Sequence, residues 1–136
     1  MRRWAAGAAV LLTVLAGCAQ PEVRSHAHAS VTVDDKDQGK LLTISCNQFQ
    51  SSWFLDITDA NASAKAIVDM NGDKASVETV EIRGFNGFTG SYWQGGTGTA
   101  DAKLMNQTFT ITGTADGMKA GETKPGTATF TITARC

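Results

Sequence analysis

Apolar and polar side chains alternate with a period of two through most of this 136-residue chain. From residue 31 to the end, runs rich in Val, Ile, Thr and aromatic residues are separated by Gly, Asn and Asp. Successive side chains of a strand point to opposite faces, so this alternation is typical of strands that bury one face. The pattern predicts an all-β domain of short strands.

Nine strands are expected in this part of the chain. They span residues 31–34, 41–46, 53–58, 65–70, 77–83, 87–93, 98–104, 108–113 and 127–135. Asn71-Gly72 and Asn86-Gly87 suit hairpin turns, because Asn and Gly tolerate the positive φ of primed turns. Residues 60–70 are rich in alanine and could also form a helix. The strand pattern favours a single antiparallel β-sandwich, with a closed β-barrel as the alternative.

The alternation also indicates which side chains face the core. In the last expected strand the apolar residues share one side with Cys136, and the threonines face outward. These sets are Ala128, Phe130, Ile132 and Ala134 against Thr127, Thr129, Thr131 and Thr133. Val77 and Val80 break the alternation, and a bulge near Glu78 or Thr79 would restore a common inward face.

The N-terminus has the organisation of a bacterial lipoprotein signal. Arg2 and Arg3 precede an apolar stretch, which ends in the lipobox Leu15-Ala16-Gly17-Cys18. This organisation predicts a signal peptide over 1–17, a lipidated Cys18 with a short tether over 18–30, and one domain over 31–136. Diacylglycerol and an N-acyl chain on Cys18 would anchor the protein to the cell membrane, facing away from the cytoplasm, because two or three acyl chains hold a protein stably.

Cys46 and Cys136 are the two cysteines that remain besides Cys18. Export places both in an oxidising compartment, where a disulfide persists. Both also share the inward side of their strands with apolar residues, so we expect a bridge between them. Two free buried thiols are the alternative.

The expected domain contains few side chains suited to catalysis or metal binding. His26 and His28, the only histidines, both fall in the expected tether, so the domain has no histidine base. The acidic stretches 34–37 and 69–73 do not fit a calcium loop and are expected to be turns. We therefore expect no enzyme activity, no metal and no cofactor apart from the acyl groups on Cys18.

The charge balance argues against nucleic acid as a partner. The signal removes two of the 12 basic residues and leaves ten, against 13 acidic residues. Binding to nucleic acid needs Lys and Arg clustered on one face, and the sequence has no such cluster.

A run from Phe85 to Trp93 is the best candidate for a binding surface. It concentrates Phe85, Phe88, Tyr92 and Trp93 among glycines, and such rings suit contacts with sugar, lipid or protein. Core aromatics that flank a tight hairpin are nevertheless the more common interpretation of such a run.

Several short stretches resemble the mycobacterial 19 kDa lipoprotein antigen family over nearly the whole expected domain. They are Val31-Thr32-Val33-Asp34 with Asp35-Lys36-Asp37-Gln38, Cys46, Asn86-Gly87 leading into Gly90-Ser91-Tyr92, Gly96-Thr97-Gly98, Ile111-Thr112-Gly113-Thr114-Ala115, and Phe130-Thr131-Ile132-Thr133 with Cys136. The resemblance implies a triacylated envelope lipoprotein that host Toll-like receptors recognise through its acyl chains, without known enzyme activity. It also implies O-glycosylation of a threonine-rich tether, but residues 19–30 contain no threonine.

Together these features favour a membrane-anchored module for binding, adhesion or host interaction, with an envelope component or a host receptor as partner. One alternative is a carrier of lipid or another apolar ligand, in which Trp53, Leu55 and Ile57 line a cavity. A carboxylate-based hydrolase is the third hypothesis, although Glu78 and Glu81 would face opposite sides of a regular strand. The partner's identity and the oligomeric state are not encoded in any of these patterns.

The lipobox can be tested with Cys18→Ser. We expect this variant to move from the membrane fraction to the medium, because serine cannot carry the thioether-linked diacylglycerol. Fractionation followed by immunoblotting measures the change. Retention of the variant in the membrane would contradict a lipid anchor at this residue.

Overall fold

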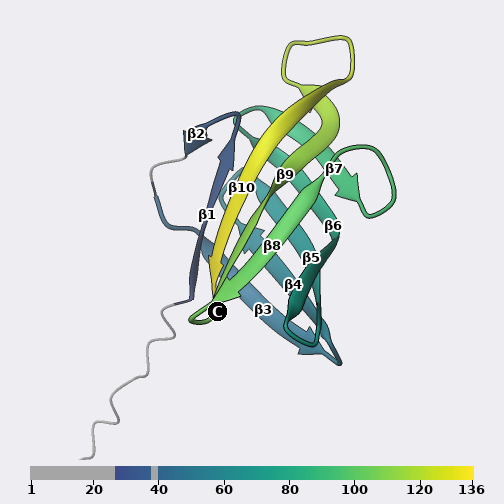
Figure 1. Cartoon of the computed structure of the whole chain (residues 1–136). Coiled ribbons are helices and arrows are strands. Elements are labelled where there is room, and N and C mark those ends of the chain that lie inside the picture. Colours follow the sequence, from purple (N-terminus) through teal and green to yellow (C-terminus); the bar gives the residue numbers. More distant parts are fainter. Residues whose placement is uncertain (1–26, 38–39) are drawn as a thin grey trace, which may run out of the picture.

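The computed structural model describes residues 27–37 and 40–136, which form ten β-strands in one antiparallel sheet (Figure 1). Neither the signal segment nor Cys18 belongs to these ranges. The described ranges contain no helix, and so none that could span a membrane. The prediction of an all-β domain is confirmed, and the alanine-rich stretch over 60–70 is not helical.

The strand bounds follow the chain in order. They are β1 His28–Val33, β2 Lys36–Asp37, β3 Thr43–Phe49, β4 Ser52–Thr58, β5 Ser63–Asn71, β6 Lys74–Phe85, β7 Phe88–Trp93, β8 Ala100–Met105, β9 Thr108–Lys119 and β10 Gly126–Arg135. Their order in the sheet is β2-β1-β10-β9-β7-β6-β5-β4-β3, and β8 pairs with β9 off this path. The two-residue β2 is the strand that the alternation did not predict.

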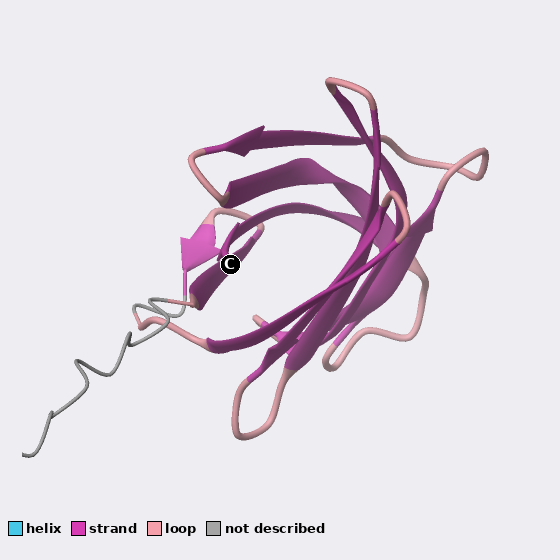
Figure 2. Ribbon diagram, turned by 90° about the horizontal axis from the view of Figure 1, so that it is seen from below, coloured by secondary structure: helices cyan, strands magenta, loops and turns pink. Residues whose placement is uncertain are grey.

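The strands form one continuous antiparallel sheet that coils around a common core (Figure 2). The closed barrel, the alternative fold, does not form, because the ladder stops at β2 and β3. Between these two edges there is one isolated bridge, in which Ala29 and Leu42 exchange hydrogen bonds of 3.1 and 2.8 Å.

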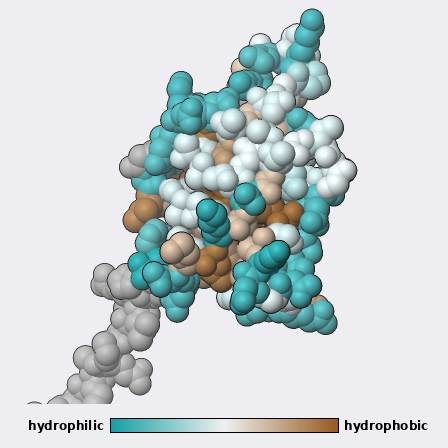
Figure 3. All heavy atoms as spheres, in the orientation of Figure 1, coloured by the Kyte–Doolittle hydropathy of each residue, from teal (hydrophilic) through white to brown (hydrophobic). Residues whose placement is uncertain are grey.

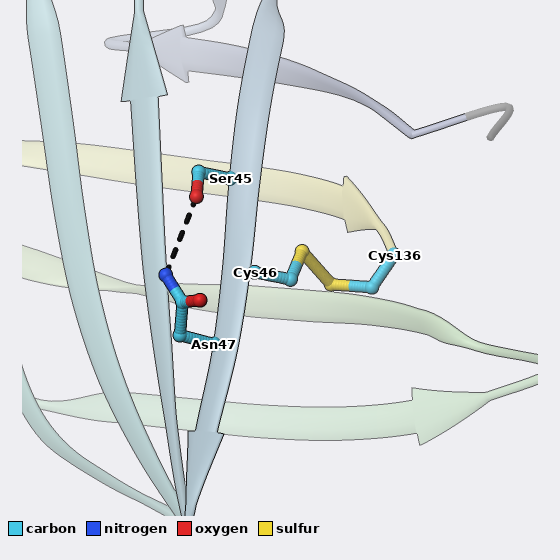
Figure 4. The surroundings of a disulfide bond; sticks show 4 residues. All are labelled: Ser45, Cys46, Asn47 and Cys136. Atoms are coloured by element: carbon cyan, nitrogen blue, oxygen red, sulfur yellow. Dashed lines mark hydrogen bonds between the residues drawn. A yellow bond between two sulfur atoms is a disulfide. The ribbon is translucent and has the colours of Figure 1, made fainter.

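The disulfide between Cys46 and Cys136 lies at the same junction and joins β3 to the end of β10 (Figure 4). The two Cα atoms are 5.9 Å apart, within the usual range for a disulfide. The predicted pairing is confirmed. Ser45 and Asn47, on either side of Cys46, point to the opposite face and share a hydrogen bond of 3.3 Å.

Strand β9 changes partner along one of its edges. Its first half pairs with β8 as far as Gly113, and its second half pairs with β7 from Asp116 onward. A Cβ atom at Gly113 or Gly117 would lie 2.1 Å from a carbonyl oxygen of the neighbouring segment. Glycine is therefore required here because the backbones approach closely.

The core matches the predicted inward set. Ala128, Phe130, Ile132 and Ala134 of β10 are at most 3% exposed, and the intervening threonines lie on the outside. The predicted bulge is also present. Ile67 pairs with Thr79 but Val68 pairs with Val77, so Glu78 is the extra residue, and both Val77 and Val80 are buried.

Two sequence-based boundaries need correction. β1 begins at His28, inside the segment assigned to the tether, so the domain does contain one histidine. The β5–β6 turn consists of Gly72 and Asp73, because Asn71 still pairs with Lys74. Asn86-Gly87, by contrast, forms the expected two-residue turn, with both residues at positive φ.

The contribution of the disulfide can be measured with the double variant Cys46→Ser/Cys136→Ser. The bridge spans 90 residues, and the chain-entropy model gives about 4 to 5 kcal/mol of stability for a loop of this length. We expect a loss of that order in urea-induced unfolding. Ser45→Ala, on the outer side of the same strand, should change stability by less than about 0.5 kcal/mol. Alkylation of both cysteines in the native protein without a reductant would contradict the bridge.

Candidate binding site on the outer face of the sheet

The aromatic segment predicted as a binding surface is mostly core. Phe85 and Phe88 are each 1% exposed and Tyr92 is 8% exposed, whereas Trp93 is 67% exposed. Phe85 and Phe88 pair across the tight Asn86-Gly87 turn and both point inward. The four rings therefore do not form one exposed surface, and only Trp93 can contact a partner.

Trp93 borders a groove of about 820 Å³ on the outer face of β3 to β7. The groove is open to solvent and lies on the opposite side of the sheet from the core. Its lining residues are Asn47, Phe54, Leu55, Asp56, Lys65, Ala66, Ile67, Thr79, Val80, Glu81, Ile82, Arg83, Thr89, Gly90, Ser91 and Trp93. We call this feature the outer groove.

Two exposed aromatic rings stand at opposite sides of the outer groove. The strand register places Phe54, Ile67, Thr79 and Trp93 in one row across β4, β5, β6 and β7. Phe54 is 40% exposed, and Ile67 and Thr79 between the rings are half-buried. Neighbouring strands lie about 4.8 Å apart, so the row spans about 14 Å between the backbones of β4 and β7.

A second row, one pleat further along, carries alternating charge. Asp56, Lys65, Glu81 and Ser91 lie in register across the same four strands. Glu81 is also held by Arg83, whose Nη2 lies 2.6 Å from Oε1. The Oδ1 atom of Asp56 is buried and accepts no hydrogen bond from any side chain or backbone group in the described ranges. The row thus combines donors and acceptors with little net charge.

A smaller hollow of about 140 Å³ lies on the other side of Trp93. Ser91, Trp93, Gly96, Thr97 and Asp116 line it. Thr97 and Thr127 both donate hydrogen bonds to the carboxylate of Asp116. Trp93 therefore stands between two depressions, with polar groups in both.

Residues 22–136 match the family model of the Mycobacterium 19 kDa lipoprotein antigen. The chain belongs to this family. A protein of Mycobacterium indicus pranii that carries a lipoprotein name is 36% identical, over 99% of this chain and 98% of its own length. A similarly named protein of Mycobacterium avium is 39% identical, over 94% and 90%. LppE of Mycobacterium tuberculosis, also named as a lipoprotein, is 32% identical, over 95% and 92%.

The family assignment makes the chain an envelope lipoprotein.

The outer groove was not predicted from the sequence. Phe54 could have been found, because Leu55 and Ile57 face inward and the alternation turns Phe54 outward. No local signal could have joined Phe54 to Trp93, since three strand pairings separate them. Trp53, by contrast, packs on Phe109 with a distance of 5.6 Å between ring centroids.

The acidic stretches lie only partly in the expected turns, because Asp37 belongs to β2 and Asp69 to β5. Asp34 and Asp35 occupy the β1–β2 turn at positive φ, and Asp73 lies in the β5–β6 turn. In the described ranges no three His, Cys, Asp or Glu side chains gather as they would around a metal ion. Asp34 instead accepts hydrogen bonds from Lys119 Nζ (2.9 Å) and the Thr129 amide (3.1 Å) and so ties this turn to β9 and β10.

This contact predicts a pH-dependent contribution to stability. The Lys119 ammonium and then the Thr129 amide lower the pKa of Asp34 from its ordinary 3.8, because both favour the ionised carboxylate. The contribution is present above the unfolded-state pKa and is lost as the pH falls through the lowered folded value.

Asp34→Asn preserves the turn, since Asn also tolerates a φ of 50°, but it removes the charge. We expect a lower Tm than that of the unsubstituted protein at pH 7 and a narrowing difference below pH 3.8. Asp35→Asn in the same turn is the control and should leave Tm unchanged. An identical Tm for Asp34→Asn at pH 7 would show that the contact adds no stability.

Proposed function

We propose that this envelope lipoprotein is a non-catalytic binding module, anchored through acyl groups on Cys18, that recognises a component of the cell envelope through the outer groove. The observation that carries the proposal is the exposure of Trp93 and Phe54 on opposite sides of one groove. Large aromatic side chains are normally buried, and an exposed pair beside a depression is characteristic of binding surfaces.

Anchoring is supported by the family and by the lipobox that ends at Cys18. A short tether limits the reach of the domain, so partners in the envelope itself are favoured. Recognition of the acyl chains by a host receptor, which the family resemblance implies, would use the anchor and not the groove. The two roles are therefore compatible.

The packing of the core argues against the apolar-carrier hypothesis. That hypothesis required Trp53, Leu55 and Ile57 to line an internal cavity. Leu55 and Ile57 are at most 1% exposed within the core cluster, and Trp53 packs on Phe109. These side chains fill the interior, which leaves the outer groove as the better place for a ligand.

The arrangement of charged groups supports binding over hydrolysis. Asp56 and Glu81 are the carboxylates of the outer groove, but Lys65 lies between them in the row and Arg83 binds Glu81. A hydrolase needs one carboxylate free to donate a proton and a second free to attack or activate water. The ion pair of Glu81 with Arg83 does not favour that division of roles.

The proposal can be tested by co-sedimentation of the acylated, detergent-solubilised full chain with delipidated mycobacterial cell-wall material. We expect Trp93→Ala to weaken binding at least tenfold, because it removes an exposed ring that makes no core contact. Met105→Ala is the control, since Met105 is 69% exposed on the β8–β9 hairpin, away from the groove. Binding that is unchanged in Trp93→Ala would contradict the groove, and release of reducing ends from the wall would contradict the absence of catalysis.

A further inference from the structure

The ligand class can be inferred from the chemistry of the groove, if the groove is the binding site proposed above. We propose that the outer groove binds a neutral oligosaccharide, with its sugar rings against Phe54 and Trp93 and its hydroxyl groups on the row of Asp56, Lys65, Glu81 and Ser91. A sugar presents apolar C–H faces and polar edges together, and the two rows of the groove present the matching groups side by side.

The aromatic row supplies the apolar part of the contact. Phe54 and Trp93 are 40% and 67% exposed, so a ring face can be covered by a ligand without unfolding the sheet. Between them, Ile67 and Thr79 give a half-buried floor. The row crosses four strands, about 14 Å from backbone to backbone at the usual strand spacing. This length favours several linked sugar units over a single one.

The charged row supplies the hydrogen bonds. Carboxylates accept from hydroxyl groups, the Lys65 ammonium donates to them, and the Ser91 hydroxyl can do either. The buried Oδ1 atom of Asp56 lacks a hydrogen-bond donor among the described residues. This oxygen therefore keeps the capacity to accept a hydrogen bond from a ligand hydroxyl.

The balance of charge selects a neutral ligand. Asp56 and Glu81 are offset by Lys65 and Arg83, so four charged side chains of the groove sum to zero. A phosphorylated or other polyanionic ligand would meet two carboxylates, and an acyl chain would bury charged groups without partners. The charged row therefore disfavours a polyanionic ligand and an acyl chain, whereas it suits the hydroxyl groups of a sugar.

A peptide strand is disfavoured for a different reason. The outer groove lies on the face of the sheet, where the N–H and C=O groups of β4, β5 and β6 are used in the ladders on both sides. An extended peptide gains most of its affinity from free backbone groups at a sheet edge. On this face its own backbone groups would find few partners.

The second hollow extends the path of the ligand. It lies beyond Trp93 and is lined by Ser91, Thr97 and Asp116, so it offers hydroxyl and carboxylate groups. An oligosaccharide that crosses the sheet can therefore meet Trp93 between two polar depressions. Trp93 is expected to contribute more than Phe54, because it is the more exposed ring and borders both hollows.

The test uses competition in the co-sedimentation assay with the full acylated chain. Three fractions of the same cell wall serve as competitors: neutral oligosaccharides released by mild acid, the lipid extract, and peptides released by proteinase. We expect the neutral oligosaccharides alone to displace the protein. Calorimetric titration with that fraction should show binding at least tenfold weaker for Trp93→Ala, about threefold weaker for Asp56→Asn, and unchanged for Met105→Ala.

Several outcomes separate this inference from the proposed function. Displacement by the lipid or peptide fraction, or by none of the three, would overturn the sugar class; continued dependence on Trp93 would then leave the binding module intact. If the sugar fraction displaces the protein but Trp93→Ala binds that fraction as well as the unsubstituted protein does, the placement of the ligand in the groove is overturned. If neither wall binding nor sugar binding depends on Trp93, both proposals fail.

Discussion

The junction between β3 and the end of β10 holds the coiled sheet together. One sheet runs from β2 through β1, β10, β9, β7, β6, β5 and β4 to β3, and the Cys46–Cys136 disulfide joins the edge strand β3 to the end of β10, near the other edge. The Ala29–Leu42 bridge adds two backbone hydrogen bonds at the same place. These links hold β3 close to β1 and β10, so the coiled sheet encloses one common core.

The coiled sheet presents two outer faces of different chemistry. β9 and β10 carry rows of threonine on the outside. The side of the molecule on which β8, β9 and β10 lie in front is mostly white and teal, of intermediate to hydrophilic character, with some brown hydrophobic patches in its lower half (Figure 3). The face of β4 to β7 instead carries the outer groove with Phe54 and Trp93. β9 links the two, since it passes from β8 to β7 at Gly113 and Gly117, where the absence of a side chain lets the backbones meet.

Properties that depend on neighbours in the sequence could be predicted well. Inward and outward positions in β10, the bulge at Glu78 and the inward thiols all follow from the period of two, which belongs to the strand itself. Errors occurred where pairing with another strand decides the outcome. β1 starts at His28 because His28 pairs with Arg135. β2 forms because Lys36 and Asp37 pair with β1 across a turn. The prediction of a binding surface at the aromatic run was wrong for a related reason. Composition does not distinguish Phe88, which faces the core, from Trp93, which faces solvent.

The all-β class, the disulfide partners, the resemblance to a lipoprotein family and the expectation of a lipid anchor at Cys18 could all be read from the sequence. All of these depend on local alternation, on the number of cysteines or on a contiguous motif. The tertiary structure alone decided that Phe54, Ile67, Thr79 and Trp93 form one row beside Asp56, Lys65 and Glu81. The register of three successive strand pairs sets that row, and register is a property of the assembled sheet that no single segment contains.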